Sequence, residues 1–362
     1  MGHSLNVAET RFSPGMSNPV GMRQPRNAVL FGLVAFAWGM NYIFVPVGLE
    51  YTSPLWLATL RAGIAIVFVA PYIYVRHRRS VLTNRDRRDA LLLGIPNTAL
   101  FLGLWFAAAP QVAAGETAIL IYTFPLWVAL FSPWVLGHHL SPRHWIAITV
   151  GFLGIVLISQ PWVPGAGSIP PGALLELLGA AVSWAIGTVL YQRRFQGAQV
   201  VQEANAYQLG GGALLLLLAT VLVEPGTTPP GAPQLWIAVL WIGVFGTAFS
   251  YMVWYYLLDQ VPAATLAAYS FLTPLVALVA AAVLLGERLT APELGGVVLV
   301  LLGIYGIGTA RRRSRGGRPT ATEGATDPGA IIAGAPAGLV ESAPTRSLGR
   351  GLESASFRPL RR

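Results

Sequence analysis

The sequence predicts an all-α integral membrane protein with ten transmembrane helices arranged as two inverted five-helix repeats. Hydrophobic residues make up 54% of the 362 residues, charged residues only 11%, and the mean hydropathy is +0.59. This is too apolar for a soluble domain of this length. The apolar residues form runs of about 20, which cross a membrane as helices, without the two-residue alternation of barrel strands. An internal sequence repeat predicts that the two halves are inverted relative to each other.

Polar or turn-forming segments bound the first five expected helices. A polar stretch, 1–27, is expected to be a cytoplasmic tail. The small residues of Ala35-Phe36-Ala37, within the apolar run that follows, would suit cleavage of a signal peptide. However, this run continues to Val47, which favours a membrane span. The basic segment RHRRSVLTNRDRRD follows the second helix, and the weakest boundary is the uncharged APQVAAG before the fourth. The expected spans are 28–48, 54–75, 89–108, 112–136 and 144–160.

Proline and glycine separate the second five helices in the same way. QPWVPGAGSIPPG precedes them, EPGTTPPGAP follows the seventh helix, and DQVP follows the eighth. The expected spans are 173–192, 203–223, 234–257, 262–286 and 291–310. The chain thus divides into a first repeat at 28–160, an extracytoplasmic linker at 161–172 and a second repeat at 173–310. A tail at 311–362, rich in Arg, Gly, Ala, Ser and Pro, is expected to be disordered and cytoplasmic.

The arginines predict the orientation of the chain, because basic residues near span ends stay on the cytoplasmic side. With the N-terminus inside, the arginines of both tails and of the loops after the second, fourth and sixth helices are all cytoplasmic. Of the loop arginines, only Arg288 then lies outside. We therefore expect a multi-pass protein of the plasma (inner) membrane with both termini in the cytoplasm.

The two halves share one sequence register. At an offset of 149 residues the matching pairs include Gly94 with Gly243, Thr98 with Thr247, Trp105 with Trp254, Gln111 with Gln260 and Pro125 with Pro274. At a slightly smaller offset Trp38 meets Trp184. Because each repeat has an odd number of spans, the second enters the membrane from the opposite face. Inverted repeats are typical of alternating-access carriers, which bind substrate near the bilayer midplane between the halves.

Several segments resemble the EamA family of the drug/metabolite transporter superfamily. They are WGMNYIFVP, PLWLATLRAG, AILIYTFPLWVALFSPWVLGHHLS with its second copy ATLAAYSFLTPLVALVAAAVLLGERLT, and the closing segments GFLGIVLI and GGVVLVLLGIYGI. The family typically ends the fourth span of a repeat with Gly-Glu. Glu287 retains this acid in the second copy, whereas His138 replaces it in the first. The resemblance implies a permease that exports or imports small metabolites.

Polar and aromatic residues inside the spans are the candidates for a substrate site. Rings supply stacking area, while amide and hydroxyl groups orient a small organic molecule. Tryptophan and tyrosine also gather in interfacial belts, and hydroxyl side chains bond to their own helix, so a structural role is the alternative. The candidates are Trp38, Asn41, Tyr42, Tyr122, Trp184, Gln208, Tyr251, Trp254 and Tyr269.

Two ionisable residues, Arg61 and Glu116, are expected within the outer half of the membrane. A charge there costs several kcal/mol unless it faces a cavity or a partner. Arg61 could extend to the outer interface, and Glu116 could be an interfacial acid at a helix start. The other interpretations are a mutual ion pair that serves as an outer gate, or contact with substrate. Their counterparts in the second repeat, Gln208 and Thr265, are neutral.

Pro125 and Pro274 occupy equivalent mid-span positions, so each removes a backbone hydrogen bond and is expected to kink its helix. The recurrence suggests hinges or gates, and static shaping of the packing is the alternative. Five glycines of the closing spans permit close helix approach: Gly151, Gly154, Gly295, Gly296 and Gly303. They are expected to build a scaffold or the face of a homodimer.

The sequence favours transport over enzymatic chemistry. It has no cysteine, its five histidines lie in tails and loops, and no His, Asp and Glu group has metal-ligand spacing. We expect no cofactor and no metal, and as partners a small-molecule substrate and the lipid bilayer without nucleic acid. A P-loop is missing, so we expect secondary or facilitated transport, in the direction of export, of small metabolites or amino-acid-like compounds. The alternative is a membrane-embedded enzyme acting on a lipid-linked substrate, which would need acids or histidines clustered at one membrane face.

Overall fold

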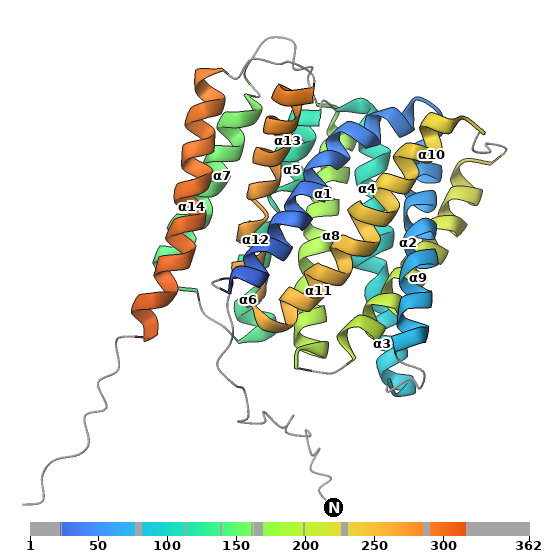
Figure 1. The fold of residues 1–362 in the computed structure, drawn as a ribbon, viewed down its shortest axis with the longest axis horizontal. Helices are drawn as coiled ribbons and strands as arrows, with labels where there is room; N and C mark the ends of the chain where they lie inside the picture. The colour runs from blue at the N-terminus through green and yellow to red at the C-terminus, as the bar shows by residue number, and fades with distance from the viewer. Residues whose placement is uncertain are drawn as a thin grey trace, which may run out of the picture. The chain divides into compact units, whose positions relative to one another are not determined.

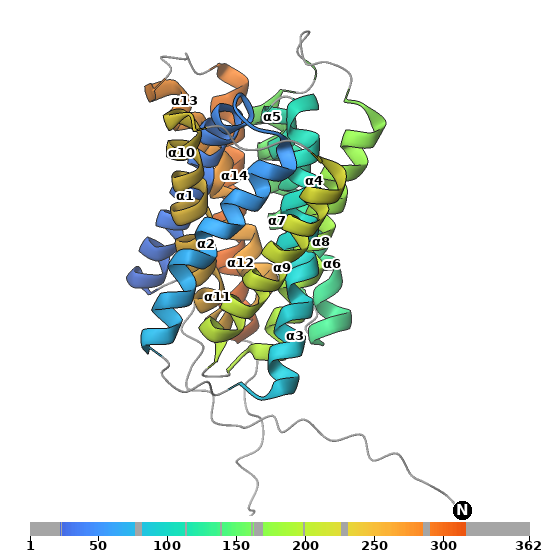
Figure 2. The same ribbon diagram turned by 90° about the vertical axis from the view of Figure 1, so that its right-hand side faces the viewer.

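The computed structural model describes residues 22, 24–76, 82–112, 114–137, 140–160, 162, 169–197, 200–225, 231–284 and 290–315. Every regular element within these ranges is a helix, and all of them belong to one compact unit, Met1–Gly317. Figures 1 and 2 show helices running side by side, with the turns gathered at two ends. The predicted all-α class is thus confirmed for this part of the chain. Most of both predicted tails and of the 161–172 linker lies outside the described residues.

Within the described residues, eight helical stretches are long and apolar enough to cross a membrane. Four of them belong to the first repeat. The first two are single helices, α1 (Pro25–Leu49) and α2 (Pro54–Arg76). The third consists of four consecutive elements, α3 (Asn84–Gly94), η1 (Ile95–Leu100), α4 (Phe101–Ala108) and η2 (Ala109–Gln111), and the fourth of the pair α5 (Ala114–Ile121) and α6 (Phe124–Leu136). The other four are α8 (Pro171–Phe195), α9 (Val201–Val223), the run α10 (Pro233–Leu240), η3 (Trp241–Phe249) and α11 (Ser250–Gln260), and the pair α12 (Ala263–Tyr269) and α13 (Leu272–Leu284).

Two further helices close the repeats, α7 (Pro142–Ser159) and α14 (Ala291–Arg315). Their apolar portions, Pro142–Ile158 and Ala291–Ile307, are shorter than those of the other eight and lie at the lower limit of spanning length. Each of the ten predicted segments is therefore helical, while the count of ten membrane spans stays a prediction.

Proline and a remote carboxylate determine where several helices begin. α1, α7, α8 and α10 carry proline at their first or second position, which loses nothing because the first N–H groups have no intrahelical partner. At the start of α2, Glu224 accepts hydrogen bonds from the backbone N–H groups of Leu55 and Trp56, both at 3.2 Å, and from the Ser53 hydroxyl at 2.5 Å. A carboxylate is favourable at this end of a helix dipole, so the contact ties the end of α9 to the start of α2.

Two π-helical segments, η1 and η3, lie at equivalent positions of the repeats. The offset of 149 residues places Asn97 of η1 opposite Gly246 of η3. A π-helical turn disturbs the usual i to i+4 bonding, and its carbonyl groups become available to other donors. The Asn97 carbonyl accepts a hydrogen bond from the Tyr251 hydroxyl at 3.3 Å, and the Gly246 carbonyl accepts one from the Trp38 indole at 3.1 Å. In both cases the donor comes from the other repeat, so these segments join the two halves.

The helices that contain the two predicted kinks are interrupted. Residues 122–123 separate α5 from α6, and residues 270–271 separate α12 from α13. Pro125 and Pro274 lie in the first turn after each interruption, where the missing N–H is tolerated. The helix of each repeat is therefore broken just before its proline, whereas the sequence predicts a kink at it.

α7 and α14 lie side by side (Figure 1), and glycines line the contact between them. A methyl group on Gly154 would lie 2.7 Å from the carbonyl oxygen of Gly296, and one on Gly303 would lie 2.7 Å from the Cα atom of Gly151. Neither position can carry a side chain unless the helices separate, so the predicted close approach is confirmed. Neither helix contributes a residue to the two cavities described next.

Candidate functional site

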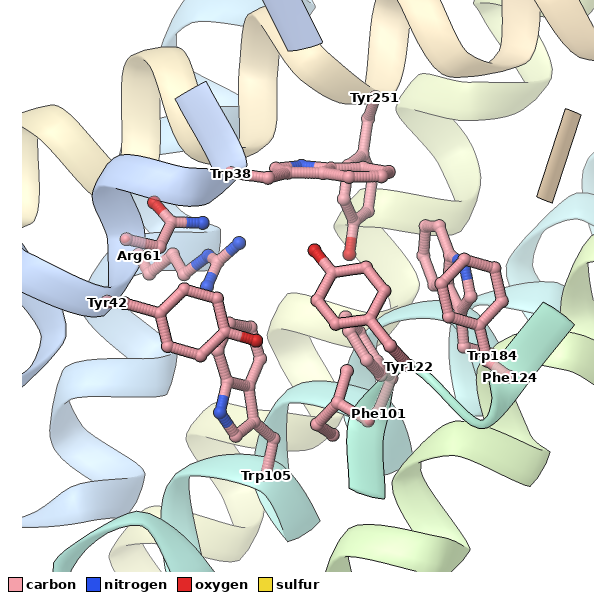
Figure 3. Close-up of a pocket in the computed structure, with 11 residues that line it drawn as sticks. Trp38, Tyr42, Arg61, Phe101, Trp105, Tyr122, Phe124, Trp184 and Tyr251 are labelled. Atoms are coloured by element: carbon pink, nitrogen blue, oxygen red, sulfur yellow. The ribbon is translucent and has the colours of Figure 1, made fainter. Parts of the chain in front are cut away.

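A buried cavity, here called the inner pocket, lies among helices of both repeats (Figure 3). It is lined by Trp38, Asn41, Tyr42, Arg61, Phe101, Trp105, Ile121, Tyr122, Phe124, Trp184 and Tyr251. Its cavity volume is about 30 Å³, which holds one or two water molecules and no organic molecule. Aromatic side chains fill the site in this conformation, so a metabolite can enter only if some of them move.

Six of the nine predicted substrate-site residues line the inner pocket. They are Trp38, Asn41 and Tyr42 of α1, Tyr122 of the 122–123 interruption, Trp184 of α8 and Tyr251 of α11. Trp38 and Trp184, which match in the repeat register, meet edge to face with ring centroids 6.2 Å apart, a favourable aromatic geometry. One tryptophan from each repeat thus contributes to the same contact.

The other three predicted residues lie outside the lining of the inner pocket. Trp254 is buried behind it, with its ring centroid 5.4 Å from that of Trp38. Gln208 is buried between α9 and η1, where its side-chain oxygen accepts a hydrogen bond from the Thr98 hydroxyl at 3.2 Å. Tyr269 packs edge-on against a phenylalanine of α1. The sequence marks these residues as polar or aromatic within a span but does not show which side of each helix meets the pocket.

Four lining residues were not among the predicted site residues: Phe101, Trp105, Ile121 and Phe124. Trp105 carried a usable signal, because it matches Trp254 in the repeat register. The other three have no polar group and no such match, so nothing in the sequence separates them from residues that face lipid.

Arg61 is buried, with 1% of its surface exposed, and its side chain points to the inner pocket (Figure 3). Its Nε donates a hydrogen bond to the Thr247 hydroxyl at 2.6 Å, and its Nη2 donates one to the Gly246 carbonyl at 3.2 Å. The guanidinium carbon lies 5.2 Å from the ring centroid of Trp105, within cation–π range. The third nitrogen, Nη1, is buried and has no hydrogen-bond partner among the described residues. The guanidinium is thus held by η3 of the other repeat and does not extend to the membrane interface.

Glu116 lies in α5, but its side chain is outside the described residues. The predicted pair with Arg61 therefore stays a prediction. The second-repeat counterparts of the two residues, Gln208 and Thr265, are both buried.

A wider cavity, here called the vestibule, adjoins the inner pocket and shares Asn41, Tyr42 and Trp105 with it. The remaining lining residues are Val45, Pro46, Leu49, Glu50, Ala109, Pro110, Val112 and Thr117. The cavity volume is about 420 Å³, within the range of sites for small organic ligands. It reaches the end of the bundle that carries the exposed residues Glu50 and Pro110, here called the Glu50 end. In the orientation predicted from the arginines, this end faces the outside of the cell.

The opposite end of the bundle, here called the Arg194 end, carries an ion-pair cluster between the repeats. Arg194, in the last turn of α8, pairs through Nη2 with Asp86 and through Nε with Asp89, the latter at 2.6 Å. Both acids belong to α3 of the first repeat. The cluster therefore holds α3 against α8 at the end away from the vestibule.

Gln192, in the same turn of α8, connects the end of α11 to the start of α12. Its side-chain nitrogen donates hydrogen bonds to the carbonyls of Leu258 at 2.7 Å and Val261 at 2.9 Å, and its side-chain oxygen accepts one from the Ala263 N–H at 2.8 Å. These are groups that helix ends leave without intrahelical partners. One buried amide thus satisfies the turn between two membrane helices.

Comparison with known proteins identifies both repeats. The model of a family described as the EamA-like transporter family matches residues 26–160 and 171–309. "Uncharacterized transporter YvbV" of Bacillus subtilis strain 168 is 29% identical over 294 residues, which cover 80% of this chain and 94% of that protein. "Uncharacterized inner membrane transporter YedA" of Escherichia coli K12 is also 29% identical, over 78% of this chain and 92% of that protein. A "Probable amino-acid metabolite efflux pump" of Salmonella typhimurium LT2 is 27% identical, over 75% and 91% of the two chains.

A protein of known crystal structure shares the fold, with a TM-score of 0.67 at 19% identity over 80% of this chain and 98% of its own. The family match spans both five-helix halves, whose apolar helices suit a membrane and whose symmetric residues meet at the inner pocket. The relatives described above are named as transporters, not as enzymes. This chain therefore belongs to the EamA-like transporter family.

Proposed function

We propose that this protein is a secondary or facilitated carrier that exports small metabolites or amino-acid-like compounds by alternating access. The observation that carries the proposal is the connection between the vestibule and the inner pocket through Asn41, Tyr42 and Trp105. An alternating-access carrier needs a substrate site where its repeats meet, reached from one side of the membrane at a time. The inner pocket has lining residues from both repeats and adjoins a cavity toward one end.

The contacts at the two ends suggest which parts change during the cycle. With the vestibule at the Glu50 end and the Arg194 cluster formed at the other, the conformation is the outward-facing one in the predicted orientation. The opposite conformation requires the Arg194 cluster to separate and the vestibule to close. The interruptions before Pro125 and Pro274 are natural hinges, because they break the helix in equivalent places. An ion pair between Arg61 and Glu116 would serve as the outer gate.

Export of amino-acid-like compounds is the finer part of the proposal. The relative named as an amino-acid metabolite efflux pump supports it at 27% identity. The inner pocket supports it chemically, because its rings offer stacking area and its amide, hydroxyl and guanidinium groups can orient a polar head.

The test is transport by the purified full chain in liposomes against a panel of amino acids, their derivatives and organic acids, with and without a pH gradient. We expect at least one class of compound to cross faster than in protein-free liposomes. Replacing the pocket residue Trp38 by alanine should slow this movement, whereas Trp134→Ala, at a position that is 75% exposed, should leave it unchanged. Failure of the folded protein to move any compound would contradict the proposal.

A further inference from the structure

One buried donor in the inner pocket is unused. Arg61 is 1% exposed, and its Nε and Nη2 are occupied by Thr247 and Gly246, yet Nη1 has no hydrogen-bond partner among the described residues. A buried guanidinium nitrogen without a partner is costly in a medium with little water. Arg61 lines the inner pocket, so a molecule bound there can supply the missing acceptor in place of water.

The fixed position of the Arg61 guanidinium also favours one kind of hydrogen-bond acceptor. Two hydrogen bonds to η3 and the ring of Trp105 fix the plane of the group, so little side-chain freedom remains to be lost on binding. A guanidinium recognises carboxylate and phosphate through charge-assisted hydrogen bonds. Of the two, a carboxylate fits better, because a phosphate dianion needs several cationic or backbone donors, and Arg61 is the only cationic residue among the described residues of the lining.

The other residues of the inner-pocket lining indicate what the rest of a bound ligand would look like. Eight of the eleven lining residues are aromatic, and none is acidic. Asn41 lines both the vestibule and this aromatic region. Its side-chain oxygen is buried without a partner among the described residues and can accept a hydrogen bond. Such a lining favours an apolar or planar body with a negative head, and none of its described residues offers a counter-charge to a cation.

We propose, on the basis of the proposed transport function, that the substrates are organic carboxylates with an apolar or aromatic body and that Arg61 binds their carboxylate through Nη1. The test compares acids with their neutral amides, which have nearly the same shape. The three pairs are isovalerate with isovaleramide, 3-phenylpropionate with 3-phenylpropionamide, and indole-3-acetate with indole-3-acetamide. Binding to the purified full chain is measured by calorimetry at concentrations up to the millimolar range.

At least one acid should bind about tenfold more tightly than its amide, which corresponds to about 1.4 kcal/mol. In the R61Q variant the acid and the amide should bind equally, whereas R61K should retain part of the preference. R143Q removes the same charge from the exposed start of α7 and should leave the preference unchanged. Retained amide binding and a cooperative melting transition show that R61Q is folded.

Three results would overturn the proposal: no acid binds, acid and amide bind equally to the unmodified chain, or the preference persists in R61Q. The first two need no variant, so the test holds even if R61Q fails to fold. Binding is measured without transport, so the two proposals can fail separately. An Arg61-dependent preference with no movement across liposomes would contradict only the transport function, and transport without the preference would contradict only the carboxylate assignment.

Discussion

Replacing Arg194 by glutamine should favour opening of the Arg194 end. Arg194 pairs with Asp86 and Asp89, whose side chains are 19% and 30% exposed, and its own side chain is 37% exposed. Water therefore screens both pairs, and together they contribute about 1 kcal/mol. Because α3 and α8 belong to different repeats, this free energy is available only while the end is closed. Loss of about 1 kcal/mol raises the ratio of open to closed protein by about fivefold.

The assay uses the absence of cysteine from the natural chain. A Thr188→Cys variant carries a single thiol, at a buried position of α8 that lies about 9 Å along the helix from Arg194 at 1.5 Å per residue. A membrane-impermeant maleimide, added to vesicles that expose the Arg194 end, labels this thiol only when the end opens. The labelling rate should rise by up to about fivefold when Arg194→Gln is added.

Arg193→Gln is the matched control, because it removes the same charge from an adjacent exposed position with no ion pair among the described residues. It should leave the labelling rate unchanged. Equal rates in the Arg193 and Arg194 variants would refute the view that the cluster holds this end closed.

Three further predictions concern the turn at α11–α12, the outer charges and the site tyrosines. Gln192→Leu leaves three buried backbone groups without a partner, at about 1–3 kcal/mol each, so the melting temperature of the purified protein should fall by many degrees; a fall of only a degree or two would show that water replaces the amide. If Arg61 and Glu116 pair, either single change to glutamine leaves a charge uncompensated at about 3–5 kcal/mol and should impair transport more than the swapped pair does, and equal losses without rescue would exclude the pair. Tyr122→Phe removes a hydroxyl from the inner pocket and should slow transport at unchanged melting temperature, whereas Tyr269→Phe, outside the lining, should not; equal effects of the two changes would contradict the placement of the site.

The broad architecture follows from the sequence for physical reasons. Helices in lipid must satisfy their own backbone groups, so the apolar runs set their positions. The odd number of runs in each repeat predicts the inversion. The π-helical segments η1 and η3 are different. Their carbonyls depend on donors such as Trp38 and Tyr251, which arrive from the other repeat, and no local pattern encodes a partner more than a hundred residues away.

The residues of the candidate site could likewise be predicted from the sequence only in part. Trp38 and Trp184 could be predicted because they are aromatic, lie within spans and match in the repeat register, and the structure places their rings in contact. Gln208 has the same polarity and depth in its span, yet it faces η1, because side-chain direction depends on how the helices rotate against each other. For Arg61 the sequence leaves extension to the interface open, and only the folded chain shows that Thr247 holds it inside.

The most direct test of the central claim is solute counterflow in liposomes that contain the purified chain. The liposomes are loaded with a transported compound, diluted, and given a trace of the same compound in labelled form. An alternating-access carrier exposes its site to one side at a time, so the label should enter by exchange, exceed its equilibrium level and then decline. A steady approach to equilibrium without this overshoot would indicate a continuous pore and would contradict the account.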